Sequence, residues 1–444
     1  MPAMVLRHTT AVMGVLLLLV TSLDAQTSQP ATPAISKADR LFMKNGLYLH
    51  ALCFHDHLLH LDTLKAAGFT GVTWPFTSNM KQLGPPPGMP WCRWLNSDEE
   101  VTLTPAEVPY LGSLVALQLR DEQNLNDDAT LAKAKKWFEI MRKRFPNVIL
   151  YTNQYGGLLT DANMARYIET CKPDMLSFDT YPILETDDTW RSYFGDLERY
   201  RAFSTGAGIP FQSWMQTFNG ENKYRNPSES ELRLDIFGAW TFGAKMQTCF
   251  TYNAGSSALF VKTFNGSGDT KLAPAYDWLK QILHESRNLS PYLSKLRCVR
   301  TAWILGKGSE YPWGVAPWKY DAEKWSELRG IAVKNLSALK GGEGGDVALG
   351  FFQPLQSSGA EERWIMVTNA LNDRNATAAQ AAQQITLNVL LKEGQTLHAA
   401  NRATGKLELA KLKKVGEAGR YLLELDLPGG TGELLCLKRA AAAP

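Results

Sequence analysis

The feature that most constrains the fold is a regular alternation of strand-like and helix-like segments across residues 45–287. Eight strand–helix units in about 250 residues are typical of a (β/α)8 TIM barrel. A doubly wound open sheet is the competing fold, but His55-Asp56-His57 stands where that fold carries its glycine-rich phosphate loop. Strands are predicted at residues 46–54, 69–76, 114–124, 148–155, 174–182, 209–218 and 245–253, with one more inside 80–113. Helices are predicted at residues 57–67, 129–145, 161–171, 190–204, 228–241 and 274–287.

The chain changes character after residue 296. Short β-prone runs alternate with Gly, Asn and Asp turns from there to residue 440. This pattern predicts an antiparallel β-sandwich. The predicted fold class is therefore α/β, with a (β/α)8 TIM barrel at residues 37–296 followed by a C-terminal all-β sandwich domain at residues 297–440.

The first 26 residues have the pattern of an export signal. Arg7 and His8 precede an apolar run at residues 11–20, and Ala25 is a small residue at a plausible cleavage point. The run is too short to span a membrane. We expect an exported protein, periplasmic or extracellular, with a leader at residues 27–36 and no membrane association after signal removal. The net charge of +3 gives no reason to expect a nucleic acid partner.

Cysteine and histidine spacing does not favour a metal site. The six cysteines are scattered without a Cys-x-x-Cys pair, so mostly buried thiols are expected. His55-x-His57 with His60 comes nearest to metal-ligand spacing, and we interpret it as a solvated helix start. We expect no catalytic metal and no organic cofactor.

Carboxylates, amides and aromatic rings collect where the predicted strands end, which is where barrels carry functional residues. Because side chains alternate along a strand, Arg120 and Glu122 are predicted to point inward, as are Asp179 and Tyr181. In the last strand, Thr251 and Asn253 are the strand-ending residues, and Phe250 and Tyr252 are assigned to the opposite face. This mixture suits a carbohydrate, since planar rings stack on sugar C–H faces; core packing is the alternative for each single ring. The candidate binding residues are Trp74, Arg120, Asn153, Tyr155, Tyr181, Trp214, Gln216, Tyr252 and Asn253.

Four stretches resemble bacterial glycoside hydrolases that join a (β/α)8 barrel to a C-terminal β-sandwich, in the clan that includes β-galactosidases. They are residues 117–124, residues 177–182 with Asp179-x-Tyr181-Pro182, residues 210–218 and residues 231–253. The resemblance implies an enzyme that cleaves glycosidic bonds in an oligo- or polysaccharide. It also implies that Glu122 is the general acid, because Glu122 matches the acid/base of that clan.

One position departs from the clan pattern. Its nucleophile is a Glu at the end of the seventh strand, and Gln216 stands there. An amide cannot act as nucleophile or base, so one interpretation is that another carboxylate serves, with Asp179 and Asp121 ahead of Glu221. Nucleophilic participation by a substrate group, a sugar-binding barrel without activity, and a polysaccharide lyase using His55, Tyr181 and Arg120 are the alternatives.

Glu122 and Asp179 form the expected catalytic pair. They lie on strands two steps apart, with backbones on the order of 10 Å apart and carboxyls at about 5 to 9 Å. We expect the longer spacing, which suits a water-activating base and an inverting reaction.

Overall fold

The computed structural model describes residues 35–54, 60–75, 88–95, 103, 105, 107–220, 223–253, 256–261, 271–356, 361–416 and 418–439. The predicted export signal, His55, His57 and Glu221 lie outside the described residues. Among the residues that are described, no helix has the length and apolar character needed to cross a membrane.

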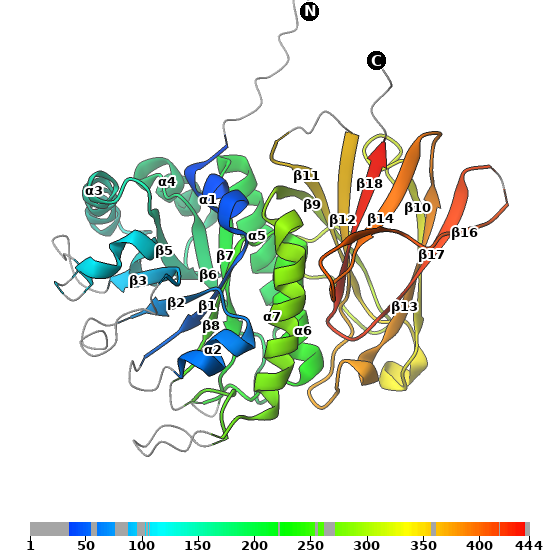
Figure 1. Ribbon diagram of the computed structural model, residues 1–444, viewed down its shortest axis with the longest axis horizontal. Helices are drawn as coiled ribbons and strands as arrows, with labels where there is room; N and C mark the ends of the chain where they lie inside the picture. The colour runs from blue at the N-terminus through cyan, green and yellow to red at the C-terminus, as the bar shows by residue number, and fades with distance from the viewer. Residues whose placement is uncertain are drawn as a thin grey trace, which may run out of the picture. The chain divides into compact units, whose positions relative to one another are not determined.

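Eight parallel strands close into a barrel, in which each strand pairs with its neighbours in chain order and the last pairs with the first (Figure 1). The expected strand inside residues 80–113 is present as β3. The barrel prediction is confirmed. The strands are β1 (Tyr48–Leu52), β2 (Gly71–Trp74), β3 (Trp91–Leu95), β4 (Leu114–Asp121), β5 (Ile149–Tyr155), β6 (Leu176–Asp179), β7 (Phe211–Gln216) and β8 (Met246–Phe250).

The helices that alternate with these strands carry local signals that explain their bounds. Asp127 caps α3, where its side chain accepts a hydrogen bond from the Thr130 N–H. Ser228 and Glu231 form the capping box that begins α6. The helices are α1 (Lys37–Asn45), α2 (Leu61–Ala67), α3 (Asp128–Arg144), α4 (Asp161–Cys171), α5 (Trp190–Ala207), α6 (Glu229–Phe242) and α7 (Pro274–Leu293), with a 3-10 turn, η3, at Val108–Ser113.

Two antiparallel sheets follow the barrel and enclose a second apolar core, as predicted for the sandwich. One sheet has the order β15-β14-β18-β12-β11-β9 and the other β10-β13-β17-β16. The strands are β9 (Leu296–Ile304), β10 (Leu328–Asn335), β11 (Val347–Pro354), β12 (Glu361–Asn369), β13 (Gln383–Leu390), β14 (Gln395–Ala400), β15 (Leu407–Leu409), β16 (Lys413–Lys414), β17 (Arg420–Leu427) and β18 (Gly432–Arg439), with 3-10 turns η4 (Leu339–Gly342) and η5 (Ala379–Ala381).

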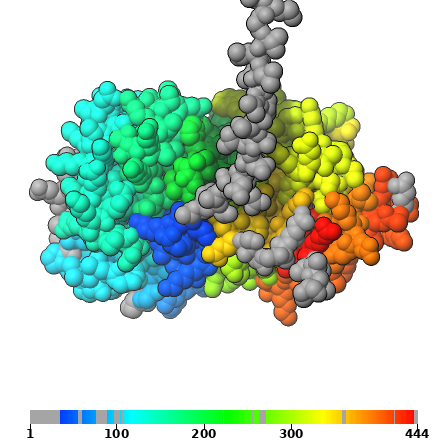
Figure 2. All heavy atoms as spheres, turned by 90° about the horizontal axis from the view of Figure 1, so that it is seen from above, coloured from blue at the N-terminus to red at the C-terminus, as the bar shows by residue number. Residues whose placement is uncertain are grey.

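Helix α6 joins the barrel to the sandwich. Every residue from Ser230 to Phe242 is buried, because the helix packs on β7 from one side and on β11 and β12 from the other. Thr241 Oγ1 lies 2.6 Å from Thr368 Oγ1, and a Cβ atom on Gly350 would lie only 1.9 Å from the Thr241 carbonyl oxygen. The space-filling view shows sandwich atoms, coloured yellow to red, directly against barrel atoms (Figure 2).

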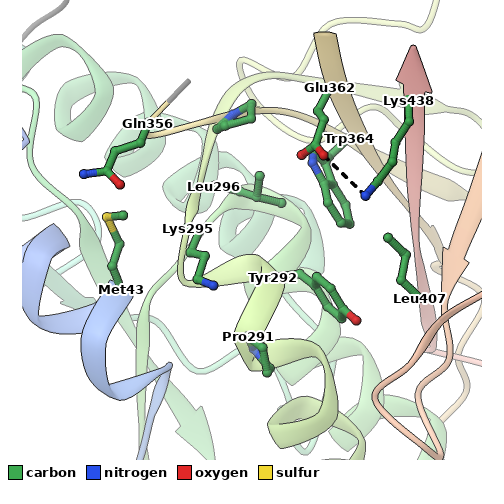
Figure 3. A pocket seen from close by; sticks show the side chains of 11 residues that line it. Met43, Pro291, Tyr292, Lys295, Leu296, Gln356, Glu362, Trp364, Leu407 and Lys438 are labelled. Atoms are coloured by element: carbon green, nitrogen blue, oxygen red, sulfur yellow. Dashed lines mark ion pairs between the residues drawn. The ribbon is translucent and has the colours of Figure 1, made fainter. Parts of the chain in front are cut away.

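A hollow of about 390 Å³ lies between α7 and the sandwich (Figure 3). Tyr292 and Trp364 line it with ring centroids 5.5 Å apart, beside the Glu362–Lys438 ion pair at 3.3 Å. Its other wall includes Met43 of α1, the helix that leads into β1. The hollow therefore lies toward the amino ends of the barrel strands, away from the carboxyl ends where barrels carry their functional residues.

All six cysteines are buried free thiols, as predicted. Burial raises the pKa of the Cys92 thiol to about 11 and that of Cys249 to about 12. These thiols therefore behave as small apolar side chains at neutral pH.

Candidate active site

Asn153, near the carboxyl end of β5, connects four neighbouring strands through its side chain. Its Nδ2 donates to Oδ1 of Asp121 at 3.0 Å and to Oδ1 of Asp179 at 3.1 Å. Its Oδ1 accepts from Ser177 Oγ at 2.8 Å and from Trp214 Nε1 at 2.9 Å. An indole N–H can only donate, so the atom of Asn153 that faces Trp214 must be the oxygen. The nitrogen, with its two protons, therefore faces the two carboxylates.

A β-bulge at the end of β4 decides which acid reaches this amide. Gln118 pairs with Tyr151 and Asp121 pairs with Asn153, so β4 holds one extra residue between the two pairs. Arg120 is at the bulge, and its φ of 65° lies in the left-handed region. The bulge reverses the alternation beyond Gln118.

The predicted inward direction of Arg120 is consequently wrong. Its guanidinium carbon lies 6.0 Å from the ring centroid of Trp137, a buried residue of α3 on the outside of the barrel. Asp121 points inward in its place and also accepts a hydrogen bond from Gln118 Nε2 at 3.2 Å. A strand without a bulge would have produced the opposite arrangement.

Glu122 lies at the rim of the site. Its backbone has a φ of 44°, its N–H donates to the Asn153 carbonyl at 2.9 Å, and the residue is exposed. Its negative charge contributes to the raised pKa of both Asp121 and Asp179. Glu122 is therefore close to both acids, but it is more open to solvent than either.

The two bridged carboxylates are close together. Each of the two oxygens is about 3 Å from the same nitrogen, so they are separated by at most about 6 Å. With one N–H proton directed at each oxygen, the 120° fork of an amide nitrogen sets the separation near 5 Å. This is shorter than the distance that we expected for Glu122 and Asp179.

Both acids have pKa values that are raised by burial. Burial raises the pKa of Asp121 to about 6, against the lowering effect of the hydrogen bond from Asn153. The pKa of Asp179 is raised well above its ordinary value by burial and then by the charges of Asp121 and Glu122. Burial and the neighbouring charges therefore favour the protonated form of Asp179, whereas Asp121, with a pKa of about 6, is mostly ionised at neutral pH.

A cluster of aromatic rings lies beside the bridging amide, to which Trp214 donates. The half-buried Tyr181 ring lies 5.7 Å from the Phe250 ring, and Phe250 lies 6.1 Å from Trp214. The assignment of Phe250 to the opposite face was wrong. Met246 packs inside the barrel, and alternation from Met246 in steps of two places Phe250 on the same inner face. Strand alternation counted from Met246 would therefore have predicted the inward direction of Phe250.

Four other predicted binding residues are buried with their side chains engaged in the fold. Gln216 donates to and accepts from the backbone of Ile183 at 2.8 and 2.9 Å. Asn253 Oδ1 accepts from the Phe54 N–H at 2.7 Å. Trp74 and Tyr252 are fully buried in the apolar core outside the barrel. These four side chains therefore support the rim from within, whereas Tyr155 is 47% exposed at the end of β5.

Within the described part of the chain, no three His, Cys, Asp or Glu side chains are arranged to hold a metal ion. The acids of the rim have amide partners instead. Asn153 was predicted as a binding residue, and its side chain orients both Asp121 and Asp179. Gln118 was not singled out from the sequence, and its side chain orients Asp121.

No protein-family model matches the sequence, and no curated protein matches it. Solved structures with a similar course of the chain include α-galactosidase I from Mortierella vinacea, with a TM-score of 0.45 and 10% identity over 90% of this chain and 98% of that chain. The family 51 α-L-arabinofuranosidase AbfB from Bifidobacterium longum has a TM-score of 0.41 and 9% identity, over 92% of this chain and 97% of that chain. The endo-β-1,4-mannanase from Thermotoga petrophila has a TM-score of 0.39 and 10% identity, over 73% of this chain and 95% of that chain. Similarity at this level does not assign an activity to this chain.

Proposed function

We propose that this protein is a glycoside hydrolase in which Asp121 and Asp179 flank the bond that is cleaved. The observation that carries the proposal is the bridge between these carboxyls at the carboxyl end of the barrel, where Asn153 donates to both. Glycoside hydrolysis needs two such groups, one to protonate the leaving oxygen and one to act at the anomeric carbon.

The pKa values divide the two roles. Asp179, whose pKa is raised well above its ordinary value, donates its proton to the leaving oxygen. Asp121, with a pKa of about 6, is the carboxylate that attacks the anomeric carbon at neutral pH. Asp179, now ionised, then takes a proton from the water that hydrolyses the glycosyl ester.

The separation of the acids favours this double displacement. Carboxyls about 5 to 5.5 Å apart suit a nucleophile, whereas about 6.5 to 9.5 Å leaves room for a water molecule between base and sugar. A limit of about 6 Å between the bridged oxygens supports the first geometry and a retaining reaction. We therefore propose a retaining reaction in place of the inverting reaction that was expected from the sequence. The proposed nucleophile is on β4, so a glutamine at position 216 is no obstacle.

The substrate that we propose is an oligo- or polysaccharide. The charges of Asp179 and Asp121 act on the Tyr181 phenol, and the Tyr181 ring lies 5.7 Å from the Phe250 ring. Such rings stack on the C–H face of a sugar. Glu122, exposed at the rim, is positioned to accept hydrogen bonds from sugar hydroxyls. Export to the periplasm or the extracellular space, as the first 26 residues suggest, would bring the enzyme to such substrates.

A panel of aryl glycosides and polysaccharides tests the activity, with release of reducing sugar as the readout. We expect at least one substrate to be cleaved by the wild type and left intact by Asp121→Asn. NMR of the first-formed anomer should then show retention. If the folded wild type releases no sugar from any member of the panel, glycoside hydrolysis is rejected. If the product is inverted, the nucleophile role of Asp121 is rejected.

A further inference from the structure

The connection between β9 and β10, residues 305–327, carries three exposed aromatic side chains. Trp313 is 56% exposed, Tyr311 38% and Tyr320 41%. Tryptophan is usually highly buried, so a ring that is more than half in solvent needs an explanation. The segment is also longer than most connections within a domain, and connections of this length commonly serve a function.

Trp313 is held in place even though it is exposed. The Arg191 guanidinium carbon lies 5.6 Å from its ring centroid. The backbone N–H of Trp313 donates to the Arg191 carbonyl at 3.4 Å. Arg191 in turn donates from Nε to the Tyr311 carbonyl at 3.0 Å and forms an ion pair with Glu310. The ring is therefore pre-organised, so a ligand that binds it does not have to order it.

The close approach of this connection to the barrel depends on Gly195 in α5. A Cβ atom at that position would lie 3.0 Å from Trp313 Cβ and 3.1 Å from the Trp313 carbonyl oxygen. Ala316 and Trp318 also pair with Trp303 of β9, at 2.9 and 2.8 Å. Trp313 is thus fixed from two directions, by the barrel and by the sandwich.

Trp313 lies at the end of the barrel where cleavage is proposed. Helix α5 follows β6, which ends at Asp179, so its first turns lie at the carboxyl ends of the strands. Arg191 and Gly195 belong to those first turns. A connection of the sandwich therefore places an aromatic ring at the end of the barrel where cleavage is proposed.

The surroundings of the ring favour a sugar over a protein partner. Arg191, whose guanidinium lies beside the ring, forms an ion pair with Glu310, and these two side chains are 48% and 71% exposed. Glutamate is depleted at protein interfaces, and Glu310 forms part of this exposed surface. One ring beside charged hydrogen-bonding groups instead matches a pyranose, which has an apolar C–H face and a rim of hydroxyls.

We propose that Tyr311 and Trp313 form a binding platform for a sugar unit of a polysaccharide, separate from the unit that is cleaved. The proposal rests on the proposed function for its substrate class. It predicts that long chains gain affinity from the platform, whereas small aryl glycosides, which occupy only the catalytic site, do not.

Gel retardation on immobilised polysaccharides tests binding, and we would use the Asp121→Asn background so that nothing is hydrolysed. Trp313→Ala should weaken retardation about tenfold, as expected for one stacked ring. Trp313→Phe should preserve most of it. Gly195→Leu, which pushes the intact ring away, should weaken it like Trp313→Ala, and Leu409→Ala, at a distant exposed apolar residue, should leave it unchanged.

Kinetics on active protein provide a second readout. Trp313→Ala should raise KM for the polymer and leave kcat/KM for aryl glycosides as in the wild type. Unchanged retardation of Trp313→Ala on every polysaccharide that retards the parent would reject the platform, as would no retardation of the parent on any of them. If retardation depends on Trp313 but no substrate is cleaved, the platform stands and hydrolysis fails.

Discussion

Asp121 and Asp179 accept hydrogen bonds from one and the same nitrogen, Nδ2 of Asn153, at 3.0 and 3.1 Å. A single amide thereby sets both the distance between the two acids and their directions. Because Trp214 and Ser177 hold the oxygen of that amide, its nitrogen cannot turn away without breaking two further hydrogen bonds. The acids are therefore placed by a rigid group on a strand, which is how catalytic geometry is best maintained.

The first prediction concerns the two acids. Asp121→Asn and Asp179→Asn should each lower kcat at least a hundredfold, because each removes a group that acts on the reacting atoms. Circular dichroism should show that both variants fold. Glu122→Gln, the control at the exposed neighbour, should retain more than a tenth of the activity. An inactive Glu122→Gln together with an active Asp121→Asn would return the general acid role to Glu122.

The pH profile depends on the same pair. Asp121 must be ionised, so kcat/KM should rise with pH through about 6, the pKa to which burial raises this carboxyl. Asp179 must be protonated, so activity should fall again at higher pH, where that acid loses its proton. The two limbs belong to the coupled pair and are to be measured as macroscopic pKa values. Activity that is constant from pH 4 to 9 would contradict these roles.

Asn153→Ala should shift this profile. The hydrogen bonds from Asn153 lower the pKa of both acids, so removing them should move the acidic limb to higher pH and lower kcat. Ser177→Ala is the control, because it removes one bond to the Asn153 oxygen and none to an acid. If the two variants have the same profile, Asn153 does not tune the acids directly.

Asp235 should make stability depend on pH. This α6 carboxyl is fully buried, accepts the Gln216 N–H at 2.8 Å, and has a pKa raised from 3.8 to about 7 by burial. The folded protein binds its proton more tightly than the unfolded chain does. The contribution of this group to the free energy of unfolding is therefore fully present below about pH 4. It falls by up to about 4 kcal/mol as the pH rises from there to about 7.

Thermal unfolding at pH 5 and pH 8 measures this loss. Asp235→Asn keeps an acceptor for Gln216 and removes the charge, so it should flatten the difference in Tm between the two conditions. Asp187→Asn, at an exposed acid, should leave the difference as in the wild type. A difference that persists in Asp235→Asn would assign the pH dependence to other groups, with Asp179 first among them.

Gly350→Ala should destabilise the junction of barrel and sandwich. Its Cβ would lie 1.9 Å from the Thr241 carbonyl oxygen, a backbone atom of a buried helix that cannot easily move. We expect a loss of about 3 kcal/mol in the free energy of unfolding, measured in urea. Gly206→Ala, with no atom within 4 Å of the added methyl, should be neutral or gain up to about 1 kcal/mol. Equal effects would show that the contact at Thr241 relaxes freely.

The sequence by itself determined the architecture, because strand and helix periodicity, helix caps and turn residues are local properties. The start of a helix at Ser228, where the structure shows a capping box, and the inward face of β6 with Asp179 followed directly from such patterns. The mostly buried state of the cysteines could also be read from their positions.

Only the tertiary structure decided which side chains reach the site. The bulge at Arg120 exists through pairing of β4 with β5, and one extra residue turns every later side chain to the other face. Asn153 likewise becomes a bridge only when β4, β5, β6 and β7 stand side by side. Trp74 and Tyr252 became core residues because neighbouring elements cover them. Register and burial depend on contacts between residues that are distant in sequence, and alternation along one strand carries no information about them.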